Sequence, residues 1–191
     1  SMGNIYSPNG SYIGGIAGHA KTNSTIANCY STSNIISTSS HNGTRYGGIC
    51  GELNTATVIN CYSTGLIKNN DEIGGIVAYA PTSNTYITNC FAANAAIINS
   101  PSSSSTFRIV GYDNGVTFRN NNAWEGLYVN NEITTDGLSN NCKGLDASLA
   151  QLNDSAFYKN PANWYNEAWD FANVWTMDTS SISPFPILKA F

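Results

Sequence analysis

Two short motifs each occur three times in this chain, at a nearly constant spacing. One is Gly-Gly-Ile and the other is Asn-Cys followed by Tyr or Phe, and their copies begin at Gly14, Gly47 and Gly74 and at Asn28, Asn60 and Asn89. The copies of the first motif are 33 and 27 residues apart, and those of the second are 32 and 29 residues apart. A repeat of this length is typical of a solenoid, because one unit cannot bury its own apolar face and needs a neighbour.

The residues between these motifs favour strands over helices. Short segments such as 24–27 and 55–59 are bounded by Gly, Asn and Ser, which is a poor composition for a helix. It suits short strands separated by turns. A unit of about 30 residues with several such strands fits one coil of a parallel β-helix, whose equivalent positions stack at about 4.8 Å. Crossovers between parallel strands are nearly always right-handed, so we expect a right-handed helix.

The spacing of the motifs predicts which side chains contact one another between coils. Three columns are expected to form the core: Ile16, Ile49, Ile76 and Ile109; Ala17, Cys50, Val77 and Val110; and Ile26, Val58 and Ile87. The glycine columns beside them indicate tight bends, in which a Cβ would collide with its surroundings. The column of Asn28, Asn60 and Asn89 is expected to be a stacked amide ladder at a turn.

The Gly-Ile-x-Gly part of the first motif resembles the GLUG motif, which is named for Gly, Leu, an undetermined residue and Gly. Residues 15–18 and 48–51 match it with Ile in place of Leu, whereas 75–78 lack the last Gly and 108–111 lack the first. The Trp- and Pro-containing segment 169–189 is similar to the end of such repeat arrays. GLUG repeats occur in tandem in bacterial surface and secreted proteins that are mostly described as adhesin-like. The resemblance implies a parallel β-helix located outside the cell or on its surface, and it implies no particular activity.

The repeat becomes irregular after about residue 100. Residues 108–124 indicate a fourth, divergent coil, whose register is left open by three consecutive asparagines at 120–122. We therefore expect an all-β fold, with a right-handed parallel β-helix of about four coils at 4–135 and a small mixed C-terminal cap at 136–191. Asp146 is the expected N-cap of a short helix in this cap. Three of the four tryptophans lie in the last thirty residues, which are expected to cover the open end of the solenoid.

Charge and composition limit the classes of partner. Only 10% of the residues are charged and the formal net charge is −4, which disfavours the phosphate backbone of a nucleic acid as a partner. The sequence shows no signal peptide, transmembrane run or lipidation motif, so no membrane insertion by this segment is expected. Residues 1–3 resemble a cloning remnant, and we expect the chain to be a C-terminal piece of a longer exported protein with further N-terminal domains.

The positions of the five cysteines indicate free thiols. Cys29, Cys61 and Cys90 share one column, Cys50 lies in another, and Cys142 is in the tail. In-register Cβ atoms of neighbouring coils are about 4.8 Å apart, whereas a disulfide needs about 3.8 Å. We therefore expect buried thiols that pack as small hydrophobic groups. The sequence contains no Cys-x-x-Cys pair and no His/Cys cluster, so neither a metal site nor a cofactor is predicted.

The second motif provides the candidate ligand-binding site. Along residues 61–68, Cys61 and Ile67 alternate onto one face and Lys68 onto the other, and because a buried lysine is costly the cysteine face is predicted to be the core. The opposite face then carries an outward column of aromatic rings flanked by hydroxyl groups: Tyr30, Tyr62, Phe91, Thr32 and Thr64. Such a strip could lie against sugar rings. The alternative is that the stacked rings only stabilise the sheet or are covered by a neighbouring loop.

Stacking also places charged and aromatic residues at equivalent positions. One column contains His19, Glu52, Tyr79 and Tyr112, and a second contains Arg45 and Glu72. The acidic residues of these coils, Glu52, Asp71, Glu72 and Asp113, do not share a column. An acid–base site needs several carboxylates on one face, so we predict surface ion pairs instead.

These observations together predict a non-catalytic adhesion or binding module that is secreted or displayed on the cell surface. Its expected partner is an extracellular polysaccharide or a surface protein. Two alternatives stay open. The first is a carbohydrate-active β-helix enzyme such as a polysaccharide lyase or hydrolase, and the second is a passive stalk whose binding domain lies elsewhere in a longer protein.

Overall fold

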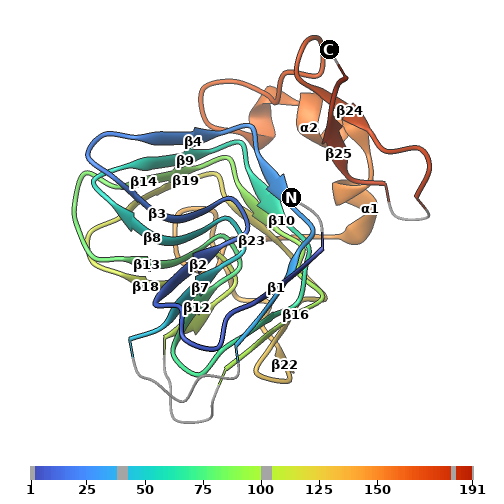
Figure 1. Cartoon of the computed structure of the whole chain (residues 1–191). Coiled ribbons are helices and arrows are strands. Elements are labelled where there is room, and N and C mark those ends of the chain that lie inside the picture. The colour runs from blue at the N-terminus through green and yellow to red at the C-terminus, as the bar shows by residue number, and fades with distance from the viewer. Residues whose placement is uncertain (1–2, 38–42, 100–104, 182–183, 191) are drawn as a thin grey trace.

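The computed structural model describes residues 3–37, 43–99, 105–181 and 184–190. The chain winds into stacked coils of short parallel strands, and its C-terminal segment packs beside the stack (Figure 1). This is the predicted parallel β-helix of about four coils with a small mixed cap.

Five parallel sheets, which we name A to E, run along the stack, and each coil contributes one strand to each sheet. Sheet A contains β1 (Asn4–Tyr6), β6 (Asn34–Ile36), β11 (Ile67–Lys68), β16 (Ala96–Ile98), β21 (Tyr128–Val129) and the antiparallel β22 (Glu132–Ile133). Sheet B contains β2 (Tyr12–Gly14), β7 (Arg45–Gly47), β12 (Glu72–Gly74) and β17 (Thr106–Phe107). Sheet C contains β3 (Ala17–Lys21), β8 (Cys50–Asn54), β13 (Val77–Ala80) and β18 (Val110–Asp113).

The two remaining solenoid sheets lie on the side nearer the cap. Sheet D contains β4 (Thr25–Ala27), β9 (Thr57–Ile59), β14 (Tyr86–Thr88) and β19 (Thr117–Arg119). Sheet E contains β5 (Tyr30–Ser31), β10 (Tyr62–Ser63), β15 (Phe91–Ala92), β20 (Asn122–Trp124) and β23 (Leu145–Ala147). Since β23 pairs with β20, sheet E continues past residue 135 into the segment that we expected to be cap.

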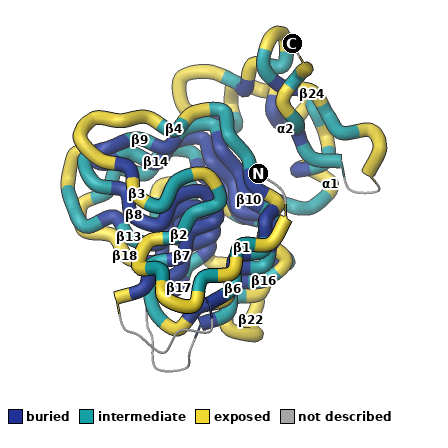
Figure 2. The backbone as a smooth tube through the Cα atoms, in the orientation of Figure 1, coloured by how far each residue is buried: buried dark blue, intermediate teal, exposed yellow. Residues whose placement is uncertain are grey.

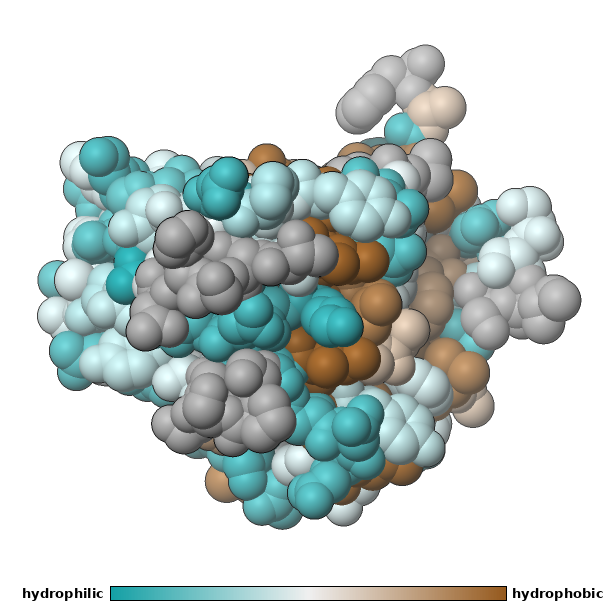
Figure 3. Space-filling view, turned by 60° about the horizontal axis from the view of Figure 1, so that its bottom comes forward, coloured by the Kyte–Doolittle hydropathy of each residue, from teal (hydrophilic) through white to brown (hydrophobic). Residues whose placement is uncertain are grey.

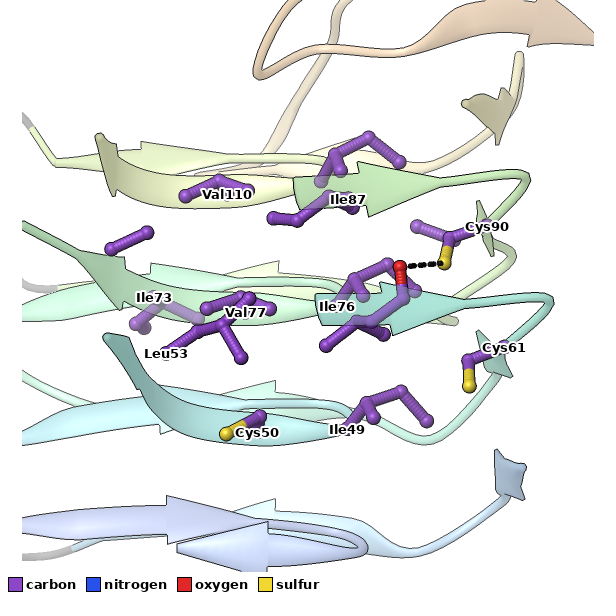
Figure 4. Close-up of a cluster of buried hydrophobic side chains, with 14 of the residues drawn as sticks. Ile49, Cys50, Leu53, Cys61, Ile73, Ile76, Val77, Ile87, Cys90 and Val110 are labelled. Carbon is purple, nitrogen blue, oxygen red and sulfur yellow. Dashed lines mark hydrogen bonds between the residues drawn. The ribbon is translucent and has the colours of Figure 1, made fainter. Parts of the chain in front are cut away.

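The predicted core columns are confirmed. Cys50 pairs with Ala17 on one side and with Val77 on the other, and Val77 pairs in turn with Val110. The side chains of Ile49, Cys50 and Val77 are fully buried, and Figure 4 shows them pointing into the interior of the stack. Ile16 is 39% exposed, because in the first coil it has a neighbouring coil on one side only.

Burial increases from the first coil toward the middle of the stack. Figure 2 shows buried residues along the inner strands and exposed residues at the turns and in the first coil. Figure 3 shows one face of the molecule, on which hydrophobic side chains gather near the centre and hydrophilic side chains surround them. One cluster of buried hydrophobic residues has members from all the coils, so the coils share one interior rather than forming independent units.

The glycine and asparagine columns mark the bends between the sheets. A Cβ on Gly48 would collide with the carbonyl oxygen of Gly75, so this bend needs glycine. Asn28, Asn60 and Asn89 have φ values of 52°, 52° and 53°, a left-handed conformation that asparagine tolerates in turns. The turn is confirmed, but the amide ladder is not found.

The asparagine side chains have other environments. Asn89 Nδ2 donates to the Tyr165 carbonyl oxygen at 3.1 Å, and its Oδ1 accepts from the Tyr165 backbone N–H at 2.7 Å. Asn60 Oδ1 is buried without a hydrogen-bond partner. In the third repeat the amide therefore bonds to the cap rather than to the coil below.

Hydrogen bonds settle the register of the fourth coil. Phe91 pairs with Asn122, which places Asn121 at the position of the cysteine column. Asn121 Oδ1 accepts from the Cys90 backbone N–H at 3.0 Å, and Asn121 Nδ2 donates to the Ile87 carbonyl oxygen at 2.8 Å. The amide satisfies two buried backbone groups, and this is why a polar residue can replace cysteine there.

The cap contains α1 (Leu149–Leu152), α2 (Ser155–Lys159), a 3₁₀ helix (Pro161–Asn163) and the antiparallel pair β24 (Trp175–Met177) and β25 (Pro186–Leu188). This part of the predicted cap packs on the outer face of sheet E rather than over the open end of the solenoid, which corrects the expectation for the last thirty residues. The end of the fourth coil meets an earlier part of the predicted cap, the segment preceding β23, where the Cys142 carbonyl oxygen accepts from the Ile109 and Val110 backbone N–H groups.

The predicted N-cap is also corrected. Ser148 caps α1, and its hydroxyl accepts from the Gln151 backbone N–H. Asp146 lies in β23, where its Oδ1 is 2.6 Å from Nη2 of Arg108, a side chain that is only 1% exposed. Asp146 pairs with the buried guanidinium instead of capping the helix, because an unpaired buried charge is costly.

Candidate functional site

The aromatic column predicted from the second motif is present. Tyr62 pairs in register with Tyr30 and Phe91. The rings of Tyr30 and Tyr62 have centroids 5.1 Å apart, and those of Tyr62 and Phe91 are 4.5 Å apart, each pair within 6° of parallel. The rings point away from the solenoid core, as expected.

This column is nevertheless covered by the cap. Tyr62 is 1% exposed and Phe91 is 0% exposed, so the expectation of an open strip is wrong. Trp169 lies 5.6 Å from Phe91 and Trp175 lies 6.2 Å from Tyr62, measured between ring centroids. The Tyr62 hydroxyl donates to the Pro186 carbonyl oxygen at 2.6 Å, and burial raises the pKa of Tyr62.

The column is therefore the floor of a second hydrophobic core, shared between sheet E and the cap. Of the five residues predicted to bind a ligand, Tyr30 and Thr64 are half-buried and Thr32 is exposed. A sugar could reach Tyr62 or Phe91 only by displacing the cap. The structure thus favours the alternative in which the rings are covered by another part of the chain.

The charged residues of sheets B and C form one connected network. Arg45 Nη1 lies 2.6 Å from Glu52 Oε2, and Arg45 Nε lies 3.7 Å from Glu72 Oε2. His19 Nε2 is 3.4 Å from the other oxygen of Glu52. Glu52 is 7% exposed, whereas Arg45 and Glu72 are half-buried and His19 is exposed. This is therefore a partly buried network centred on Glu52 rather than the surface ion pairs that we predicted.

Aromatic rings enclose the guanidinium of this network. The central carbon of the Arg45 guanidinium lies 3.5 Å from the ring centroid of Tyr79 and 5.1 Å from that of Tyr12. Tyr79 stacks on Tyr112 with centroids 4.9 Å apart, and the Tyr12 and His19 rings are 5.5 Å apart. We call this group the Arg45 cluster, and its members are Tyr12, His19, Arg45, Glu52, Glu72, Tyr79 and Tyr112.

Repeat equivalence accounts for most of the Arg45 cluster. Register pairs His19 with Glu52, Glu52 with Tyr79 and Arg45 with Glu72, as expected from the sequence. Tyr12 was not among the residues predicted from the sequence, although it is the first-coil equivalent of Arg45. Alignment of the first coil with the second would have identified this residue.

Glu72 is a half-buried carboxyl group of the Arg45 cluster. Burial raises its pKa, and the neighbouring carboxylate of Asp71 raises it further, while the Arg45 guanidinium opposes both effects. Glu72 therefore takes up a proton at higher pH than an ordinary glutamate does.

The cysteines are free thiols, as predicted, but Cys29 and Cys142 are half-buried rather than buried. Cys61 and Cys90 are fully buried, and Cys61 Sγ accepts from the Cys29 backbone N–H at 3.4 Å. The Cys90 thiol donates to the Val58 carbonyl oxygen at 3.7 Å (Figure 4). Burial raises the pKa of Cys50 to about 12, so this thiol stays protonated at neutral pH.

No group of three or more His, Cys, Asp and Glu side chains within the described ranges is arranged to hold a metal ion. Among the same residues, no helix has the length and apolar character that a membrane span requires.

The strand topology and the repeats define a parallel β-helix. The family model of the GLUG motif matches residues 9–36, so the chain carries this motif. Over 97% of its length the chain is also similar, at 26% identity and with a TM-score of 0.75, to a Bacteroides ovatus protein whose crystal structure was determined at 1.30 Å and which is provisionally described as an immunoglobulin A1 protease. The chain spans 55% of that protein. None of the curated protein sequences matches it.

Proposed function

We propose that this chain is a non-catalytic binding module of an exported protein, and that the Arg45 cluster binds an extended glycan. The observation that carries the proposal is the set of partly exposed rings around a fixed guanidinium, since Tyr12 is 39% exposed and Tyr112 is 40% exposed. Aromatic rings supply apolar contact area, and a few fixed polar groups orient a ligand. A sugar ring has an apolar face and a hydroxylated edge, so it matches both.

The Arg45 cluster has the shape of a strip. It draws residues from all four coils, from Tyr12 in β2 to Tyr112 in β18, which corresponds to three coil spacings or about 14 Å. Each contact with one sugar contributes little, and affinity accumulates when several sugars of one polymer are held together. This favours an extracellular polysaccharide over a single small molecule.

The position of Arg45 favours binding over hydrolysis. Glycoside hydrolysis by two carboxylates needs the scissile bond to lie between them. In the Arg45 cluster the guanidinium itself contacts both Glu52 and Glu72 and fills this position. The carboxylates are therefore better placed to fix the guanidinium than to act on a substrate.

The Bacteroides ovatus protein is described as a protease, but this chain spans only 55% of it. We therefore do not propose peptide-bond hydrolysis for this chain. A binding module within a longer surface or secreted protein accords with the GLUG motif and with the low charge of the chain. Such a binding module could bind a surface protein instead of a glycan, and this is the alternative partner.

A glycan array followed by calorimetry tests the proposal. Tyr112→Ala removes an exposed ring at one end of the strip and is expected to weaken glycan binding at least fivefold with little change in melting temperature. The matched control is Tyr128→Ala in sheet A, which removes a ring that is 47% exposed outside the Arg45 cluster. Equal glycan affinity for both variants and the unmodified chain would place the site elsewhere. If the unmodified chain binds no glycan, the passive-stalk alternative replaces the proposal, and polysaccharide cleavage would support the enzyme alternative.

A further inference from the structure

A pocket separate from the Arg45 cluster lies between the outer face of sheet D and the cap. Its volume is about 280 Å³, just below the roughly 300–1,000 Å³ of sites for drug-sized ligands. Its walls include Thr57, Tyr86, Thr88 and Arg119 from the solenoid and Tyr165 and Glu167 from the cap. A space of this size suits one sugar residue rather than a longer segment.

Arg119 differs from the other two arginines of the chain. Arg45 contacts two glutamates, and Arg108 contacts Asp146. No carboxylate within the described ranges lies at ion-pair distance from Arg119. Arg119 is a half-buried cation at the wall of the pocket, and Glu167, which also lines the pocket, is not within ion-pair distance of it.

Two tyrosines hold this guanidinium. Its central carbon lies 4.5 Å from the ring centroid of Tyr165 and 5.2 Å from that of Tyr86. Aromatic rings contact a guanidinium through its flat faces, whereas its N–H groups point outward in its plane. The in-plane donors match the two oxygens of a carboxylate, which they can bind with two parallel hydrogen bonds.

The cap side of the pocket is fixed to the solenoid. The Asn89 side chain exchanges two hydrogen bonds with the Tyr165 backbone, at 2.7 and 3.1 Å. The preceding residue, Trp164, is 3% exposed in the core of the cap. The pocket is therefore formed before a ligand arrives, which lowers the entropy cost of binding.

We propose that this pocket binds one acidic sugar residue, such as a uronic acid, through its carboxylate. Arg119 binds the carboxylate, and the hydroxyl groups of the sugar contact Thr57, Thr88 and the carboxylate of Glu167. Glu167 accepts hydrogen bonds from hydroxyl groups but repels a second anionic group, so an acidic peptide is disfavoured. This inference does not depend on the Arg45 cluster.

Titration with glucuronate, followed by saturation-transfer NMR, tests the site with the whole chain. Neutral glucose tests the need for the carboxylate, and alanine tests recognition of an amino acid by Arg119 and Glu167 together. We expect millimolar binding of glucuronate and at least about tenfold weaker binding of glucose and alanine. Arg119→Gln should weaken glucuronate binding at least tenfold, and Arg119→Lys should restore only part of it, because lysine lacks the planar fork.

The matched control is Lys68→Gln, which removes the same charge from an exposed position in sheet A. Its glucuronate affinity should equal that of the unmodified chain. Absence of glucuronate binding, equal binding of glucose or alanine, or an equal loss in Lys68→Gln would each overturn the proposal. The melting temperature of each variant, measured in parallel, separates a lost contact from a lost fold.

Discussion

Replacement of Tyr62 by alanine is expected to destabilise the protein by about 4–6 kcal/mol. Truncation of a fully buried aromatic side chain costs about 3–5 kcal/mol, and Tyr62 is 1% exposed. Its hydroxyl also donates to the Pro186 carbonyl oxygen at 2.6 Å, and the loss of such a bond adds about 1 kcal/mol. Because whole domains are stable by only about 5–15 kcal/mol, this change should leave the cap poorly attached.

Urea unfolding at 25 °C measures this loss. Fluorescence reports on the cap, since Trp164, Trp169 and Trp175 all lie in it, and circular dichroism reports on the strands. Tyr62→Phe should cost only about 1 kcal/mol, because the ring is kept and one hydrogen bond is lost. The exposed control Tyr128→Ala should stay within about 0.5 kcal/mol. A loss below about 1 kcal/mol for Tyr62→Ala would refute the docking of the cap on the aromatic column.

Three further predictions follow from burial and charge. Ile49→Asp puts a carboxylate at a fully buried core position and should cost more than about 4 kcal/mol, so an unchanged melting temperature would contradict the register. In the native protein Cys61 and Cys90 should react slowly with a maleimide and then fully after denaturation, and a disulfide found by mass spectrometry would contradict the free thiols. The pKa of Glu72 is raised in the native state, so the carboxyl group stays protonated to higher pH in the native state than in the unfolded state. Ionisation of Glu72 therefore lowers the free energy of unfolding once the pH rises above the pKa of the unfolded state. Glu72→Gln should therefore change the melting temperature more favourably at about pH 7 than at about pH 3.5, and the opposite order would show that the ion pair with Arg45 dominates.

The repeat in the sequence determined the solenoid and its register. Once two motifs recur at a spacing of one coil, equivalent residues must stack, so Cys50 has to lie beside Ala17 and Tyr62 beside Tyr30. The stacking of the aromatic column and the free state of the cysteines follow from the same register. These features depend on contacts between equivalent positions, which periodicity alone specifies.

Only the tertiary structure shows which segments cover the outer faces of the sheets. Nothing in residues 60–65 indicates that a segment more than 100 residues later covers Tyr62, because hydrophobic contact is not directional and any apolar surface can cover an aromatic column. Likewise, Arg45 reaches both Glu52 and Glu72 because two columns converge where sheet B bends into sheet C. The pocket at Arg119 exists because the cap loop at 165–167 lies against sheet D. Equivalence within a repeat is a local property that the sequence displays, whereas the pairing of a repeat face with a non-repeating segment depends on how the whole chain packs.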